Sequence, residues 1–426
     1  MLIKSYYLNT SCLGFKLIQL KSLTFLKKIM SFKFRGGPAI IITAAFIGPG
    51  TITLCVLAGV QNGFSLLWAM LLSITITIVI QNTTARISFT TRKGLAESLL
   101  LQTSNPIVKF LLGVLLISAI FIGNAAYETG NLTGALVGIQ ALTPGLDFYF
   151  GTNFYFLPIL VGSLVAVLIV LGSHKLLKNI LIGIVLLMSI SFVLTAILTQ
   201  PNILEVLRGM FIPSFNSKDT LTIVGLLGTT VVPYNLFLHA ALVKDESLSL
   251  QALRLDTVFA VSLGGLVSLS IIICAAALQG QSIQSATDLG LALAPLYGDF
   301  APVLMSLGFF AAGITSAITA PMAAAFVVCE CFGWRSNSWG YKSTALLVLA
   351  CGILFSSLQI KPIEVIRFAQ ITNGILLPVV GFFILILINN SRLMRGQTAR
   401  LGLNVLLFSI EFFFLFLGVK SLGLIF

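Results

Sequence analysis

Long apolar stretches separated by short polar segments run along most of the chain. A stretch of about 20 predominantly apolar residues is long enough to cross a lipid bilayer as a helix. The pattern predicts eleven membrane-spanning helices, at 38–60, 64–86, 107–132, 152–172, 177–199, 219–243, 257–280, 301–330, 341–359, 364–389 and 401–424. The polar connections near 200–219, 244–256 and 281–300 are expected to be ordinary loops. We therefore predict an all-α, multi-pass integral membrane protein surrounded by the lipid bilayer.

Two clusters of helix-breaking residues interrupt the first and the sixth predicted spans. The first cluster is Gly48-Pro49-Gly50 and the second is Val232-Pro233-Tyr234-Asn235. A membrane helix tolerates such a break only where the freed backbone groups are buried in protein or line a polar cavity. One break alone would fit a kink in a packed helix, but paired breaks at corresponding positions are typical of a secondary transporter's substrate site. The pattern therefore favours discontinuous helices 1 and 6 around such a site.

The two breaks also indicate an internal duplication. Pro49 and Pro233 lie 184 positions apart, and each falls in the first of five successive spans. An odd number of spans inverts the second group relative to the first, which is the LeuT-like arrangement of two inverted five-helix repeats. We predict a first repeat at 35–200, a second at 201–390, and a cytoplasmic linker with an eleventh helix at 391–426. Residues 1–34 are expected to form a basic cytoplasmic segment, unless translation starts at Met30.

The formal charge of +12 bears on topology rather than on nucleic-acid binding. With a cytoplasmic N-terminus, 20 of the 25 lysines and arginines fall on the cytoplasmic side, which satisfies the positive-inside rule. The five on the outer side are Arg208, Lys218, Lys361, Arg367 and Lys420. We expect a cytoplasmic N-terminus and an external C-terminus in a bacterial inner membrane, with no nucleic-acid partner. Enzyme signatures are not found, so neither an enzyme nor a cofactor is predicted.

Ionisable side chains inside the predicted spans are candidates for function, because they are costly in a membrane and usually functional. Glu128 in the third span could handle an ion or a proton, or could be a protonated carboxyl held by hydrogen bonds. His239 in the sixth span could belong to a proton path, since histidine titrates near neutral pH, or could be a structural histidine. Glu330 is expected to be solvated at the cytoplasmic edge, and Glu411 to serve packing or a lipid interface.

Neutral polar side chains gather near the two breaks. Thr51 follows the first break and Thr229 precedes the second, so both place hydroxyl groups near the predicted cavity. Gln370 and Asn373 lie three residues apart on the tenth span and therefore share one face. They could face the cavity or hold helices together. The small-residue stripe at 308–319 in the eighth span is expected to allow close helix packing.

Several short motifs follow one another in the order found in a known transporter family. Gly48-Pro-Gly-Thr51 lies where that family has Asp-Pro-Gly-Asn, and Val232-Pro-Tyr-Asn-Leu-Phe-Leu-His239 is similar to its Met-Pro-His-Asn-Leu-Tyr-Leu-His. The segments 84–97, 308–319 and 370–378 are similar to the family's segment after helix 2 and to its helices 8 and 10. From about Gly37 to Arg395 the chain thus resembles the Nramp family of proton-coupled divalent-metal transporters.

The departures from the family pattern concern its metal site. The resemblance implies that the Asp and Asn of the first motif and the Met of the second hold the metal, and these positions are Gly48, Thr51 and Val232 here. The family's histidine after the helix 6 proline is Tyr234, and its helix 3 aspartate corresponds to Ala125, with Glu128 as the retained partner. The anionic ligand and the soft thioether, which favours transition metals, are both missing.

The residues and the resemblance together predict a secondary active transporter that moves a metal cation by alternating access. The predicted substrate-site positions are Gly48, Thr51, Thr229, Val232 and Gln370, with Pro49, Gly50 and Pro233 at the helix breaks. Glu128 and His239 are candidates for proton or ion coupling, and Tyr234, Asn235 and Asn373 for supporting the site. A neutral site would also suit a monovalent ion or a small polar solute, so such a transporter, or a membrane sensor without transport, remains an alternative.

Overall fold

The apolar segments fold into helices in the computed structural model, which describes residues 47–143, 149–150, 154–171, 175–283, 285–335, 338–358 and 360–425. The predicted basic segment 1–34 and the start of the first span lie outside these residues. The only strands among them are β1 (Tyr149–Phe150) and β2 (Phe154–Tyr155), which pair antiparallel in a short hairpin. The remaining elements are helical, as the composition predicts.

Most predicted spans correspond to one long helix. These helices are α4 (Leu67–Thr91), α6 (Pro106–Leu142), α8 (Lys175–Leu198), α12 (Leu250–Ala276), α15 (Ala301–Phe332), α16 (Trp339–Ser356), α17 (Pro362–Asn389) and α18 (Leu401–Ile425). Within the described residues, nine helical segments are long and apolar enough to cross a membrane. The prediction of eleven also counts α7 (Leu157–Leu171), which is shorter, and the span at 38–60, which is described only from Ile47.

The sixth span is broken where the sequence predicts. Helix α10 (Thr220–Thr230) ends before Val231, and α11 (Pro233–Val243) begins at Pro233 after the extended Val232. At the first cluster, Gly48 is extended and α3 (Pro49–Asn62) begins directly after it. Both prolines occupy the first helical turn, where the missing N–H has no intrahelical partner to lose. Gly50 lies inside α3, so the break precedes this residue instead of including it.

Two of the polar connections are not ordinary loops, and that expectation is wrong. The connection near 200–219 contains α9 (Ile203–Phe211) and the short η1 (Ser217–Asp219). The one near 281–300 contains α13 (Ala286–Gly290), η2 (Leu291–Leu293), α14 (Ala294–Tyr297) and η3 (Gly298–Phe300). Side-chain caps help to stabilise these helices: Leu204 N donates to Asn202 Oδ1 (3.1 Å), and Ser285 forms a capping box with Asp288. Hydropathy does not detect elements this short.

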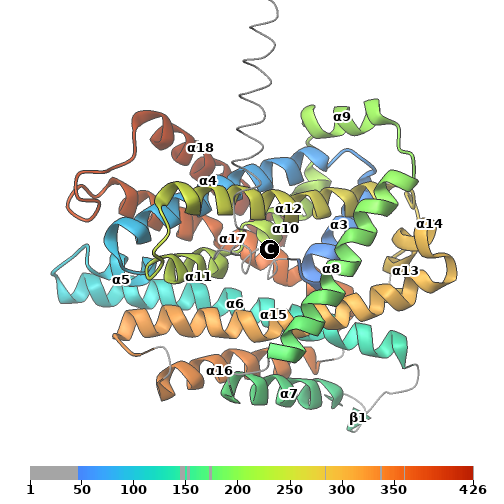
Figure 1. Cartoon of the computed structure of the whole chain (residues 1–426), viewed down its shortest axis with the longest axis horizontal. Helices are drawn as coiled ribbons and strands as arrows, with labels where there is room; N and C mark the ends of the chain where they lie inside the picture. Colours follow the sequence, from blue (N-terminus) through green and yellow to red (C-terminus); the bar gives the residue numbers. More distant parts are fainter. Residues whose placement is uncertain are drawn as a thin grey trace, which may run out of the picture. The chain divides into compact units, whose positions relative to one another are not determined.

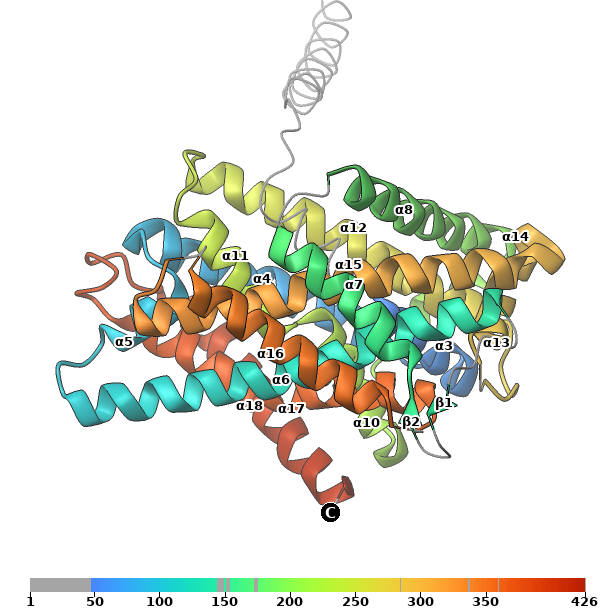
Figure 2. The same cartoon turned by 90° about the horizontal axis from the view of Figure 1, so that it is seen from below.

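Helix α6 continues ten residues beyond its predicted end at Leu132. It runs beside α15 (Figure 1), and glycines allow the two backbones to approach closely. A Cβ on Gly313 would lie 2.6 Å from Ala135 N, and one on Gly138 would lie 2.5 Å from Ser306 O. The small-residue stripe of α15 therefore serves close packing, as expected. Helix α16 packs against α7, and α18 packs against α17 (Figure 2).

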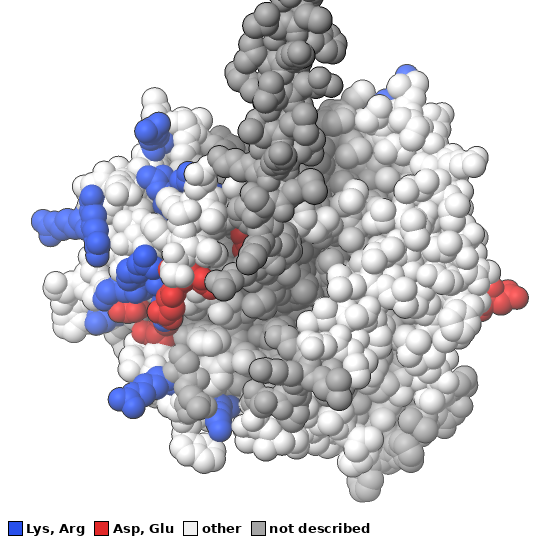
Figure 3. All heavy atoms as spheres, viewed as in Figure 1, with Lys and Arg blue, Asp and Glu red and all other residues white. Residues whose placement is uncertain are grey.

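The outer surface fits a bilayer. Large apolar side chains are exposed on several long helices, for example Phe110 on α6 (69%), Leu160 on α7 (59%) and Phe412 on α18 (73%). Lys and Arg side chains gather at the end that carries the short helix α5 (Leu95–Leu100) and the α17–α18 connection (Figure 3). The described part of the chain therefore has an apolar surface along its long helices and one strongly basic end.

Candidate substrate site

Helices α3 and α10 touch directly at the predicted site. Thr51 Oγ1 on α3 and Thr229 Oγ1 on α10 are 2.7 Å apart and share a hydrogen bond. Both side chains are fully buried. Residues separated by 178 positions in sequence are thus joined at the point where α10 stops and α3 starts.

Hydroxyl groups from two further helices face Gly48. A Cβ on Gly48 would lie 3.2 Å from Ser316 Oγ on α15 and 3.6 Å from the Tyr127 hydroxyl on α6. The Tyr127 ring packs edge to face against Tyr234 on α11, with ring centroids 5.2 Å apart. The position that is an aspartate in the family pattern is therefore closely bordered by neutral hydroxyls. Tyr127 and Ser316 were not among the predicted site residues, although Tyr127 precedes Glu128 directly.

Gln370 is wedged between the two half-helices. A Cβ on Gly50 of α3 would overlap the Gln370 side-chain amide, and one on Gly228 of α10 would overlap the Gln370 backbone carbonyl. Gln370 Oε1 is buried without a hydrogen-bond partner among the described residues. Asn373, one turn further along α17, contacts α6 instead, where its Oδ1 would lie 3.3 Å from a Cβ on Gly123. Only Gln370 of this pair therefore borders both breaks.

The backbone at the second break adds partial charges. Pro233 has no N–H to donate to the carbonyl of Thr229, four residues earlier. The carboxyl end of α10 carries the negative end of its helix dipole, whereas the first turns of α3 and α11 carry positive ends. Val232 is buried at the break and provides only its backbone as a ligand. A cation here would be held by carbonyl and hydroxyl oxygens near the end of α10.

Glu128 does not face the Thr51–Thr229 pair. Its side chain lies against Gly352 on α16, where a Cβ would come within 2.6 Å of Glu128 Cγ. Asn131 Nδ2 donates to Glu128 Oε2 (3.4 Å), and Oε1 is buried with no partner among the residues that the structure describes. No ion pair within the described part of the chain neutralises this carboxyl group. Glu128 is therefore a buried acid beside the site, one residue after Tyr127.

His239 and Asn235 lie buried on α11. His239 is next to the Gln81 backbone on α4, without a well-aligned hydrogen bond to it. Both polar atoms of the Asn235 amide are buried and lack partners among the described residues. In that same part of the chain, no three His, Cys, Asp or Glu side chains gather as a metal-binding group. The potential cation ligands at the breaks are therefore neutral oxygen atoms.

Only 9% of the Glu330 side chain is exposed, so the expectation of a solvated side chain is wrong. It lies at the start of α5, where Ala96 N donates to Glu330 Oε2 (3.2 Å) and Lys244 Nζ approaches Oε1 (3.6 Å). The contact joins the end of α15 to α5 and to the residue after α11. Sequence gave no sign of it, because Gly94, on which the carboxylate rests, is 236 positions away. Glu411 packs against Gly381 of α17, in line with the packing role expected of it.

Glu330→Gln is expected to lower the free energy of unfolding by about 2 kcal/mol, because charged hydrogen bonds of this kind contribute about 1.5–3 kcal/mol. Glu97→Gln is the matched control, since Glu97 pairs with Lys93 at 2.7 Å but is 40% exposed. Such a surface pair contributes at most about 1 kcal/mol. Thermal unfolding of both purified variants measures the difference, and equal shifts would contradict a structural role for Glu330.

Comparison with known proteins identifies the family. The model of the family described as "Nramp: Natural resistance-associated macrophage protein-like" matches residues 39–423. The chain belongs to the Nramp family. A divalent metal cation transporter, MntH, of Deinococcus radiodurans is 28% identical over 353 residues, which cover 79% of this chain and 77% of the relative.

Solved structures share the fold. The Eremococcus coleocola manganese transporter superposes with a TM-score of 0.71 at 18% identity, covering 91% of this chain and 85% of that one. MhsT in complex with L-phenylalanine gives a TM-score of 0.58 at 16% identity, covering 91% of this chain and 98% of its own. These likenesses confirm the predicted all-α, LeuT-like architecture of this Nramp protein.

Proposed function

We propose that this Nramp protein is a secondary active transporter that moves a metal cation by alternating access through the site between its broken helices. The observation that carries the proposal is the Thr51–Thr229 hydrogen bond between α3 and α10. A movement of either half-helix must change this contact, so substrate binding and helix movement are linked at one place. Relatives from two bacteria that are named divalent metal cation transporters support the same function.

The donor atoms narrow the choice of cation. Hydroxyl, amide and carbonyl oxygens are hard ligands, and the thioether that favours transition metals is absent at Val232. Removing all water from a divalent ion without a carboxylate partner would cost several kcal/mol. We therefore propose a hard cation that keeps part of its hydration shell, which suits Mg²⁺ because it dehydrates reluctantly. A monovalent ion or small polar solute is the second candidate, because the site is neutral.

Proton coupling and orientation form part of the proposal. Glu128 and His239 are buried titratable groups on α6 and α11, which both border the site, and we assign ion or proton coupling to them. The basic end seen in Figure 3 supports a cytoplasmic N-terminus and an external C-terminus. We place the protein in a bacterial inner membrane. The bacterial origin of the two relatives supports this location.

Ion influx into proteoliposomes tests the transport proposal. We expect saturable Mg²⁺ influx under an imposed proton gradient, at least about tenfold slower in Thr229→Val and Gln370→Ala. A tenfold loss corresponds to about 1.4 kcal/mol, which is the size of one lost hydrogen bond. Thr372→Val is the control, because Thr372 lies on α17 near Gln370, is partly exposed, and its hydroxyl donates to the Phe368 carbonyl. Mn²⁺ is tested in parallel to measure selectivity.

The possible results separate the functional alternatives. Influx of Mg²⁺ that the site variants abolish and Thr372→Val preserves supports the proposal. Lack of influx of either divalent ion, with K⁺ or a small solute transported instead, would assign the second candidate function. Binding without any flux from folded protein would indicate a sensor.

A further inference from the structure

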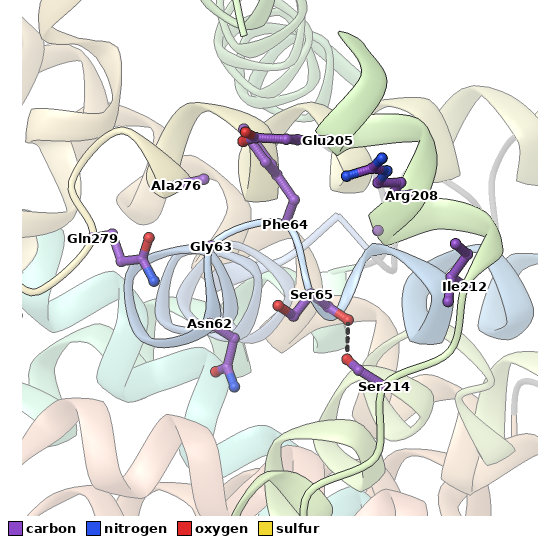
Figure 4. A pocket seen from close by; sticks show the side chains of 11 residues that line it. Asn62, Gly63, Phe64, Ser65, Glu205, Arg208, Ile212, Ser214, Ala276 and Gln279 are labelled. Atoms are coloured by element: carbon purple, nitrogen blue, oxygen red, sulfur yellow. Dashed lines mark hydrogen bonds between the residues drawn. The ribbon is translucent and has the colours of Figure 1, made fainter. Parts of the chain in front are cut away.

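A pocket lies away from the two helix breaks. It has a volume of about 450 Å³ and is bordered by the turn between α3 and α4, by α9 and by the end of α12 (Figure 4). None of the residues that border the two breaks lines it. The pocket is therefore a separate feature of the molecule.

Tight contacts hold the walls of this pocket in place. A Cβ on Gly209 of α9 would overlap the Phe64 carbonyl oxygen, so only glycine allows α9 to rest on the turn. Ser214 Oγ donates to Ser65 O (3.1 Å), and Trp68 Nε1 donates to Ser214 O (3.1 Å). The walls are thus connected by direct contacts from α4 to the segment after α9.

The outer face of α9 is apolar and exposed. Ile203 is 65% exposed, Leu204 57% and Phe211 68%. Helix α9 connects α8, which ends at Leu198, to α10, which starts at Thr220, so it lies where two membrane helices reach the bilayer surface. A helix with exposed apolar residues at this level is covered by lipid chains. The surroundings of the pocket therefore point to a lipid as its occupant.

Helix α9 supplies two opposite charges to the edge of the pocket, both on exposed residues. Arg208 and Glu205 lie three residues apart and project from α9 toward the turn at Gly63 and Phe64 (Figure 4). Among the described residues, no ion pair or hydrogen bond engages the Arg208 guanidinium. Glu205 accepts only a long hydrogen bond from Asn202 Nδ2 (3.4 Å). Both charged groups are thus available to a ligand.

A neutral acceptor completes the pocket. Asn62 Nδ2 donates to Asp219 Oδ1 (2.8 Å), which leaves Asn62 Oδ1 buried without a partner in the described chain. Guanidinium groups bind phosphate through two parallel hydrogen bonds. A carboxylate and an amide oxygen accept hydrogen bonds from a primary ammonium group. The pocket therefore matches a phosphate joined to a primary amine.

We propose that this pocket binds the headgroup of a phospholipid with a primary ammonium group, such as phosphatidylethanolamine. Arg208 binds the phosphate, Glu205 and Asn62 accept hydrogen bonds from the ammonium group, and the acyl chains cover the apolar face of α9. The bound headgroup bridges α9 and the end of α12 to the turn that follows α3, the half-helix that carries Thr51. The lipid would thus stabilise this end of the half-helix.

Lipid titrations of the delipidated, full-length protein in detergent test the proposal. We expect phosphatidylethanolamine to raise the midpoint of thermal unfolding saturably, and more than phosphatidylcholine with the same acyl chains. Arg208→Gln is expected to weaken this response at least about tenfold, because one charged hydrogen-bond pair is lost. Glu205→Gln is expected to remove the preference over phosphatidylcholine, whose quaternary ammonium group has no N–H. Lys361→Gln, at the same end but outside the pocket, is the control and should respond like the wild type.

Three results would overturn the assignment. An unchanged lipid response in Arg208→Gln would exclude the pocket as the binding site. Equal responses of the wild type to both lipids would exclude recognition of the ammonium group. Stabilisation of the same size by free phosphoethanolamine would show that the ligand is a soluble phosphate compound instead of a lipid. Ion flux is not measured, so the outcome is independent of the transport proposal.

Discussion

Gly228→Ala is expected to destabilise the protein by about 3 kcal/mol, the upper end of the usual range for overpacking. Its Cβ would overlap the Gln370 carbonyl oxygen and lie 2.5 Å from Gly374 N. Both atoms belong to the backbone of α17, so no side-chain rotation can relieve the clash. Helices α10 and α17 would have to separate, which also moves Thr229 and Gln370 apart. Thermal unfolding of the purified variant measures the loss.

Gly183→Ala is the matched control for this prediction. Gly183 lies inside α8, and a Cβ there would meet no atom of the described residues within 4 Å. Alanine has the higher helix propensity, so this variant should be as stable as the wild type or up to about 1 kcal/mol more stable. Similar behaviour of the two variants would contradict the close approach of α10 and α17.

Gly48→Asp combined with Val232→Met is expected to raise Mn²⁺ affinity at least about tenfold, or 1.4 kcal/mol. The aspartate restores an anionic oxygen ligand and the methionine a soft sulfur ligand. A Cβ at Gly48 would lie 3.2 Å from Ser316 Oγ, so the aspartate needs this neighbour to shift by a few tenths of an ångström. Aspartate is also a favoured residue before a helix, and Gly48 directly precedes α3. Isothermal titration with Mn²⁺ measures the gain.

The neutral variant Gly48→Asn with Val232→Met separates charge from shape. Asparagine has nearly the same size as aspartate but no negative charge, so the gain in Mn²⁺ affinity should be largely lost. If the asparagine and aspartate variants bind Mn²⁺ equally well, the missing carboxylate is not what distinguishes this site from that of the family pattern.

The helix breaks and the site differ in how far sequence could predict them. Pro233 interrupts a helix through its own ring and missing N–H, so its effect can be read locally. Thr51 and Thr229 were expected near one cavity, but their mutual hydrogen bond depends on how α3 and α10 approach. Tyr127 and Ser316 were missed because only packing turns their hydroxyls toward Gly48.

The sequence did not predict toward which neighbouring helix a buried side chain points. Glu128 remains a candidate for ion or proton coupling, and packing alone sets its Cβ and Cγ against Gly352 of α16. Glu330 was expected in solvent, yet its carboxylate lies against the start of α5. In both cases hydropathy gives the depth along the helix and does not say which neighbour covers each face.

Membrane embedding, the order of the spans and the two breaks therefore follow from local properties of the chain. Apolar length sets which segments can cross a bilayer, and proline acts on its own helix. Tertiary structure alone decides that Gln370 sits between Gly50 and Gly228, and that α9 closes a charged pocket against Phe64. These contacts join residues far apart in sequence, and their geometry depends on which glycines let two backbones meet.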